Sequence, residues 1–149
     1  MVKSFKRLQK EAKEIEDDFK EILEMVVVRE DWSRWHIKFV GAAGSVYEGE
    51  PYTLQFSFNN QYPIEPPEVQ FIGVAPIHEH VYSNGFICLS TLDSDWSPAL
   101  KVSSVCLSVL SMLSSATEKK SPPNESASLA YFAGKTPRQV RWEFHDEKC

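Results

Sequence analysis

The sequence has few cysteines, no long hydrophobic run and no basic excess, and each absence excludes a class of protein. The 149-residue chain has three cysteines, too few and odd in number for a disulfide framework, which favours a reducing intracellular compartment. No apolar run approaches the about 20 residues that cross a bilayer, and the N-terminus lacks the apolar core of a signal peptide. The net charge of -5 argues against a general nucleic-acid binder. We therefore expect a protein of the cytoplasm or nucleus that binds neither membrane nor nucleic acid.

Composition indicates one globular domain, and its charges are unevenly distributed along the chain. The chain is 42% hydrophobic and 25% charged, which is close to the average for folded domains. Residues 1–10 carry four basic residues and no acid, whereas residues 11–31 carry nine acids and three bases. The basic segment suggests docking to an acidic protein surface, although an exposed helix end would carry the same charges. We predict a single domain over residues 1–149, in which residues 134–149 form either a mobile tail or a short docked helix.

Hydrophobic periodicity predicts an α+β fold. Apolar residues three and four positions apart predict an amphipathic helix over residues 4–24. Alternating or short apolar segments predict the strands, which are expected at residues 35–39, from Tyr47, at 52–58 and at 69–72. A second apolar stripe predicts a central helix from Val102 to Leu113, and residues 127–133 are expected to form a short helix. Helices that stand apart from an antiparallel meander are typical of the α+β class.

The irregular stretch at residues 73–101 holds the candidate catalytic groups. A structureless segment of this length inside a domain is usually functional. Cys88 follows a turn signal at residues 83–85 and is a candidate nucleophile, or else a small buried core residue. The other cysteines are weaker candidates, because Cys106 lies on the apolar stripe of the second helix and Cys149 is terminal.

His78 and His80, which lie ten and eight residues before Cys88, leave three interpretations open. A histidine beside a nucleophilic cysteine is the arrangement of a thiol protease, but no acidic or amide partner for the histidine is evident. A zinc site would need a second close pair of ligands, which the sequence lacks, so no metal is expected. The interpretation that we favour for His78 is that it orders the loop through hydrogen bonds.

Five segments follow one another along the chain in a specific series: residues 6–11 (KRLQKE), 47–49 (YEG), 62–69 (YPIEPPEV), His78 with 82–89 (YSNGFICL), and 96–100 (WSPAL). This series resembles the ubiquitin-conjugating enzyme family over nearly the whole chain. The resemblance implies four antiparallel strands flanked by helices, with a shortened C-terminal helical region. It also implies that Cys88 accepts the C-terminus of ubiquitin as a thioester, since noncatalytic members of this fold lack that cysteine. Such a role requires a sulfur that solvent can reach.

Where the chain departs from the common family pattern, it resembles the W-type members, which modify the α-amino group at a substrate's N-terminus. His80 stands where most members have asparagine, and Ser90 stands where many have aspartate. The W type also has that histidine and a similar C-terminal ending, but Glu79 departs from it, because proline is expected there. Three alternatives stay open: a lysine-directed enzyme, a carrier of another ubiquitin-like modifier, and a noncatalytic ubiquitin-binding scaffold.

The resemblance also implies partners and residue roles. The partners are ubiquitin, the ubiquitin-activating enzyme, RING-type or U-box-type ligases, and protein substrates with flexible N-termini. No cofactor is expected in the chain, because the upstream activating enzyme uses the ATP. The matching positions are expected to act in catalysis (Cys88 and His80), in ordering the loops (His78 and Trp96), and in binding the activating enzyme and ligase (Lys6, Arg7, Ile64, Pro98 and Ala99).

Overall fold

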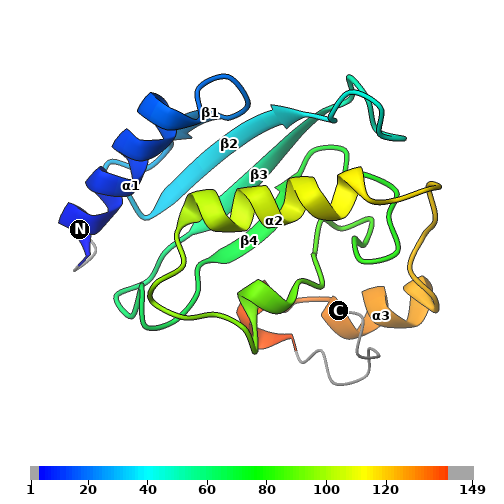
Figure 1. Cartoon of the computed structure of the whole chain (residues 1–149). Coiled ribbons are helices and arrows are strands. Elements are labelled where there is room, and N and C mark those ends of the chain that lie inside the picture. The colour runs from blue at the N-terminus through cyan, green and yellow to red at the C-terminus, as the bar shows by residue number, and fades with distance from the viewer. Residues whose placement is uncertain (1–3, 141–149) are drawn as a thin grey trace.

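A four-stranded antiparallel sheet forms the centre of the fold (Figure 1). The computed structural model describes residues 4–140. The strands pair in chain order and are β1 (Glu24–Val27), β2 (Arg34–Val40), β3 (Pro51–Ser57) and β4 (Glu68–Ile72). The helices are α1 (Phe5–Asp18), α2 (Val102–Ser114) and α3 (Glu125–Phe132), and short 3-10 turns occur at Ser90–Leu92 and Pro137–Gln139. The predicted α+β class is confirmed.

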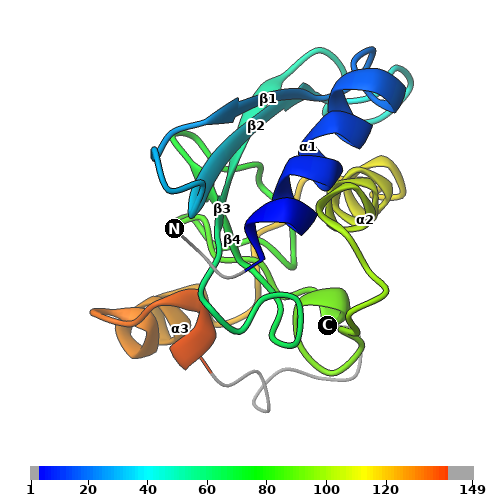
Figure 2. The same cartoon turned by 90° about the vertical axis from the view of Figure 1, so that its left-hand side faces the viewer.

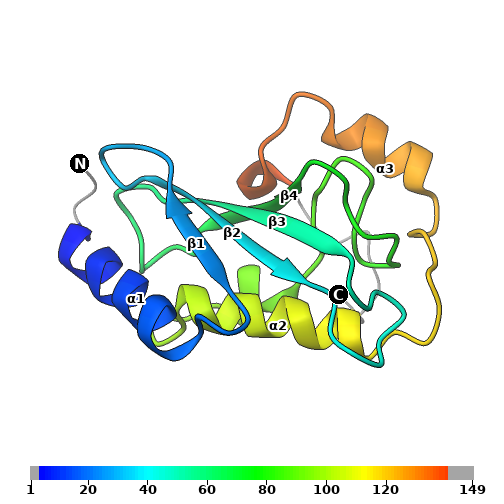
Figure 3. The same ribbon diagram turned by 90° about the horizontal axis from the view of Figure 1, so that it is seen from above.

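Helices α1 and α2 cover one face of the sheet, and α3 lies away from them at the β4 end of the sheet (Figures 2 and 3). Along β2 and β3 alternate residues are buried, because successive side chains of a strand point to opposite faces. Leu54 pairs with Ile37 on one side and with Phe71 on the other, so the inward side chains of three strands meet. Val105 and Val109 of α2 belong to the same core cluster.

The first helix is shorter than its periodicity predicts. It ends at Asp18, and the chain then turns into β1, a strand that the sequence analysis missed. Leu23 enters the core, whereas Ile22 is 48% exposed although it continues the helical spacing. The predicted helix over residues 4–24 is therefore too long. Apolar side chains continue the helical spacing past Asp18, but they belong to the turn between the helix and the sheet.

The predicted strand at Tyr47 is wrong. The chain turns at this position between β2 and β3, and the tyrosine ring is fully buried in the core. Its hydroxyl donates a hydrogen bond to the carbonyl oxygen of Ile77. An aromatic residue occupies this position because the side chain packs into the core from a turn, not because the residue belongs to a strand of the sheet.

The C-terminal part of the described chain forms a small second cluster. The ring of Phe132 in α3 packs 4.8 Å from that of Tyr82 and 5.1 Å from that of Phe86, measured between centroids. Val140 is buried in the same cluster. The remainder of the predicted tail, residues 141–149, lies outside the described residues. No helix within residues 4–140 has the length and apolar character that crossing a membrane requires.

Candidate active site

Cys88 follows a tight hairpin that glycine makes possible. The Tyr82 N–H donates to the carbonyl oxygen of Phe86, and the Gly85 N–H donates to that of Tyr82, both at 2.9 Å. Gly85 has a φ of 95°, and a Cβ atom at this position would lie 2.1 Å from the carbonyl oxygen of Phe71. The Phe71 N–H in turn donates to the Gly85 carbonyl oxygen at 2.9 Å. The hairpin is therefore fastened to the edge of β4, which holds the backbone that leads to Cys88.

Hydrogen bonds join Cys88 to His80 and His80 to the ring of His78. The Cys88 N–H donates to the carbonyl oxygen of His80 at 2.9 Å, and the His80 N–H donates to Nδ1 of His78 at 2.9 Å. A ring nitrogen accepts a hydrogen bond only in the neutral imidazole. Burial, with a smaller effect from the nearby His80, lowers the pKa of His78 and so favours this neutral form. His78 thus has the geometry of a residue that orders the loop.

The sulfur of Cys88 is closed off in this structure, in contrast to the accessible thiol that was expected. The residue is 1% exposed and is disulfide-bonded. A disulfide offers no thiolate for nucleophilic attack, so thioester chemistry here requires reduction of the sulfur and opening of its surroundings. Cys106 is free and buried in α2, where burial raises the pKa of its thiol far above the ordinary value. This agrees with its expected role in packing, whereas Cys149 lies outside the described residues.

His80 lines a pocket of about 240 Å³ between its own loop and the residues that follow α2. Its Nε2 lies 3.8 Å from a carboxylate oxygen of Glu79, the residue at the expected proline position. Glu118 and Lys120 also line this pocket, so it has both acidic and basic residues in its wall. Within the described part of the chain, no group of three or more His, Cys, Asp or Glu residues is arranged to hold a metal ion.

The structure brings most of the residues expected at a partner surface to one side of α1. Arg7, Pro98 and Ala99 line a single pocket of about 420 Å³. Lys6, Pro98 and Ala99 are exposed, and Arg7 is partly buried. Ile64 is 71% exposed, so its apolar side chain is available for contact.

Trp96 connects the loop of Ile64 to the loop of Pro98. Its Nε1 donates to the carbonyl oxygen of Pro63 at 2.9 Å, and its ring centroid lies 6.0 Å from that of Tyr62. Pro63 immediately precedes Ile64, and Trp96 lies two residues before Pro98. The indole therefore links the bases of the two loops, which is the geometry of a loop-ordering residue.

Sequence reasoning missed a buried carboxylate behind these loops. Glu11 is 4% exposed, and its side chain accepts hydrogen bonds from Arg7, from the Tyr62 hydroxyl and from the Val102 N–H. The available signal was its place on α1, three residues after the buried Leu8 and thus on the same face. A buried acid of this kind needs several polar partners, because burying an unpaired charge is costly.

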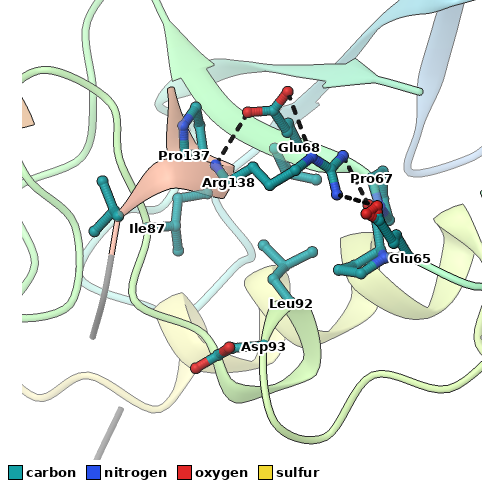
Figure 4. A pocket seen from close by; sticks show the side chains of 11 residues that line it. Glu65, Pro67, Glu68, Ile87, Leu92, Asp93, Pro137 and Arg138 are labelled. Atoms are coloured by element: carbon teal, nitrogen blue, oxygen red, sulfur yellow. Dashed lines mark hydrogen bonds and ion pairs between the residues drawn. The ribbon is translucent and has the colours of Figure 1, made fainter. Parts of the chain in front are cut away.

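A further pocket, of about 270 Å³, adjoins Cys88 through its neighbour Ile87. Figure 4 shows Arg138 crossing this pocket toward Glu68 and Glu65. The backbone N–H of Arg138 donates to the Glu68 carboxylate at 3.0 Å. A guanidinium nitrogen of Arg138 lies 3.7 Å from a carboxylate oxygen of Glu65. These contacts fasten Pro137–Gln139 to the start of β4. No local sequence pattern predicts them, because the partners lie about 70 residues apart in the chain.

Comparisons with known proteins agree on one family. The family model for ubiquitin-conjugating enzymes matches residues 7–144. A probable ubiquitin-conjugating enzyme E2 W of Dictyostelium discoideum is 49% identical over 142 residues, which cover 95% of each chain. A probable E2 W-A of Danio rerio is 48% identical over 97% of each chain. Among solved structures, the ubiquitin-conjugating enzyme UbcA1 of Agrocybe aegerita is 41% identical, with a TM-score of 0.80 over 87% of this chain and 95% of that chain.

Proposed function

This chain belongs to the ubiquitin-conjugating enzyme family as a W-type enzyme, and on that premise we propose that Cys88 carries ubiquitin and passes it to the α-amino group at a substrate's N-terminus. Enzymes of this family take ubiquitin from an activating enzyme as a thioester and work with ubiquitin ligases. The proposal concerns which residues of this chain do so and which amine receives the ubiquitin.

The hydrogen bond from the Cys88 N–H to the His80 carbonyl oxygen carries this proposal. It joins the cysteine to the histidine that replaces the usual asparagine, on a backbone that the preceding hairpin holds in place. Cys106 is no alternative, because its thiol is buried in the core and its pKa is raised by that burial.

Transfer exchanges the thioester for an amide. The unprotonated amine attacks the carbonyl carbon of the ubiquitin bound to Cys88, which gives a tetrahedral intermediate with a negatively charged oxygen. The carbon–sulfur bond then breaks, Cys88 leaves as a thiolate, and the nitrogen loses a proton to solvent. We propose that His80 donates an N–H to the oxyanion or orders the loop whose backbone does so.

The choice of acceptor follows from the ionisation of amines. At pH 7 a lysine side chain, with a pKa of about 10.4, is unprotonated roughly once in 2,500 molecules, whereas an α-amine with a pKa of about 8 is unprotonated roughly once in ten. The α-amine therefore needs less help in losing its proton. Ser90 stands where many family members have an aspartate near the cysteine, which suits an acceptor that needs little such help.

Discharge onto two matched peptides tests this preference. The peptides share one sequence, but one has a free α-amine and an acetylated lysine, and the other has the reverse. At pH 7 we expect the α-amine to accept ubiquitin about tenfold faster, because its larger unprotonated fraction outweighs its lower basicity. The preference should shrink as the pH rises above 8, since the lysine continues to lose protons while the α-amine is already deprotonated. Equal or faster discharge onto lysine would identify a lysine-directed enzyme instead.

We also propose that Lys6, Arg7, Ile64, Pro98 and Ala99 form the ligase surface of this enzyme. Two exposed apolar loops beside a basic helix end make a small interface, which suits a weak and transient complex. The same helix end would meet the activating enzyme, as the family resemblance implies.

Replacing Pro98 with aspartate is expected to lower ligase-stimulated discharge about tenfold, because a charge would be desolvated in an apolar contact. Loading by the activating enzyme should still go to completion. The measurement is the rate of thioester loss with and without ligase. The matched control is Val74→Asp, since Val74 is an apolar residue, 84% exposed, beyond the end of β4. Equal ligase stimulation of the two variants would exclude the ligase surface.

The remaining parts of the proposal concern setting and substrate. We propose that the enzyme needs no cofactor of its own, because the activating enzyme uses the ATP. We further propose that it acts in the cytoplasm or nucleus, where thiols are kept reduced. Its substrates would have flexible N-termini, since the attacking amine must reach the thioester carbonyl.

A further inference from the structure

We propose that Glu11 is a positioning residue whose buried carboxylate holds three segments of the ligase surface in one arrangement. This inference rests on the ligase surface proposed above. Glu11 itself is only 4% exposed and lies at the base of the pocket that Arg7, Pro98 and Ala99 also line. Its partners come from α1, from the loop that carries Ile64, and from the start of α2, directly after the loop that carries Pro98.

The carboxylate of Glu11 binds one donor from each segment. Its Oε2 accepts from Nε of Arg7 at 2.8 Å and from the Tyr62 hydroxyl at 2.7 Å. Its Oε1 accepts from the Val102 N–H at 2.7 Å. Tyr62 lies two residues before Ile64, and Val102 directly follows residues 97–101. One side chain therefore joins the helix to the bases of both apolar loops.

The partners of Glu11 extend these links toward the surface. Arg7 donates from Nη2 to the Leu100 carbonyl oxygen at 2.7 Å, and its guanidinium lies 5.4 Å from the centroid of the Tyr62 ring. The Tyr62 ring packs against Trp96, whose Nε1 donates to the Pro63 carbonyl oxygen. Arg7 thus holds the Pro98 loop directly, and Tyr62 and Trp96 hold the Ile64 loop.

The pKa values of Arg7 and Tyr62 suit their role as hydrogen-bond donors to Glu11. Burial alone would lower the pKa of Arg7, but the hydrogen bond and charge of Glu11 raise it above its ordinary value. Burial raises the pKa of the Tyr62 hydroxyl, and the charge of Glu11 adds to this effect. Both donors therefore keep their protons in the neutral pH range.

Glu14 offers a matched comparison on the same helix. It pairs with Lys101, the last residue of the Pro98 loop, and accepts from the Ser103 hydroxyl at 2.6 Å, so it also joins α1 to that loop and to the start of α2. Within the described chain its hydrogen bonds do not extend to the Ile64 loop. The link to Tyr62 distinguishes Glu11, and it matters because loops that are already ordered bind a partner with a smaller loss of entropy.

Three variants test the role of Glu11. Glu11→Gln keeps the side-chain shape, but its amide nitrogen cannot accept, so either the bond from Arg7 or the bond from the Val102 N–H is lost. Tyr62→Phe keeps the ring and removes the hydroxyl, and Glu14→Gln is the control. Discharge of a preformed ubiquitin thioester is measured against ligase concentration. We expect the apparent KM for ligase to rise about fivefold in Glu11→Gln and Tyr62→Phe, with the ligase-saturated rate changed less than about twofold. Glu14→Gln should keep the KM of the wild type.

Hydrogen exchange separates positioning from general destabilisation. In Glu11→Gln and Tyr62→Phe, amide exchange should accelerate in peptides that cover residues 62–67 and 97–101. Exchange in β2 and β3 should match the wild type, since their core packing is untouched. Equal acceleration across the sheet would mean that the variants only loosen the fold, and it would overturn the inference.

The Pro98→Asp variant tests the ligase surface independently of the positioning role of Glu11. If Pro98→Asp lowers ligase stimulation but folded Glu11→Gln and Tyr62→Phe keep the wild-type KM, the ligase surface stands and the positioning role is refuted. A rise in KM of the same size in Glu14→Gln would also refute it. If Pro98→Asp has no effect either, the ligase surface and the positioning role are both wrong.

Discussion

Replacing Cys88 with alanine is expected to abolish the ubiquitin adduct completely, because the methyl side chain has no nucleophile to hold an acyl group. The reduced protein is incubated with activating enzyme, ubiquitin and ATP, and a gel is examined for an adduct that reductant removes. Cys106→Ala and Cys149→Ala are the matched controls and should load like the wild type. In particular, Cys106 has a thiol whose pKa is raised by burial, which makes it a poor nucleophile.

An adduct that persists in Cys88→Ala, or that is lost in Cys149→Ala, would contradict this assignment. Because Cys88 is 1% exposed and disulfide-bonded in the structure, its accessibility must be measured as well. Alkylation before and after reduction reports whether the thiol becomes reachable. A reduced Cys88 that resists both alkylating reagent and charged ubiquitin would refute its role as the nucleophile.

Replacing His80 with alanine is expected to slow discharge onto an α-amine peptide roughly 100-fold, while loading of Cys88 still goes to completion. A preorganised donor to an oxyanion contributes about 3 kcal/mol, which corresponds to this factor. The rate is measured in a single turnover of the preformed thioester without ligase. The backbone bonds of residue 80, to His78 and to Cys88, do not depend on its ring, so the variant removes the imidazole alone.

Two further variants make the His80 result specific. His80→Asn restores an N–H donor at the position where most family members have asparagine, and it should recover part of the lost rate. His36→Ala is the control, because His36 lies on β2 and its ring contacts Gln55 of β3 at 3.1 Å. Discharge by His80→Ala at the wild-type rate would remove His80 from the mechanism.

Much of the fold could be predicted because its signals are local. Alternation in β2 and β3 follows from the two faces of a strand, and the spacing of Val102, Val105 and Val109 follows from the turn of a helix. Residues 83–85 predict a turn before Cys88, and Gly85 does adopt the positive φ that such a turn uses. These features depend on neighbours within a few residues.

The parts that could not be predicted depend on residues far apart in the chain. Glu11 binds Tyr62 and Val102, and Arg138 binds Glu68 about 70 residues away. Strand β1 was missed because its four residues carry no alternation strong enough to separate them from the end of a helical pattern. No local pattern states which distant polar group a buried or half-buried charge will meet.

By itself, the amino-acid sequence determined the α+β class, the helix and strand periodicities and the series of motifs around Cys88, because each is encoded by residues close together in the chain. Only the tertiary structure decided that one buried carboxylate, Glu11, joins three segments, and that Cys88 is enclosed rather than open to solvent. The physical reason is that burial and long-range hydrogen bonds arise only when separate segments pack together, and a one-dimensional pattern does not contain those distances.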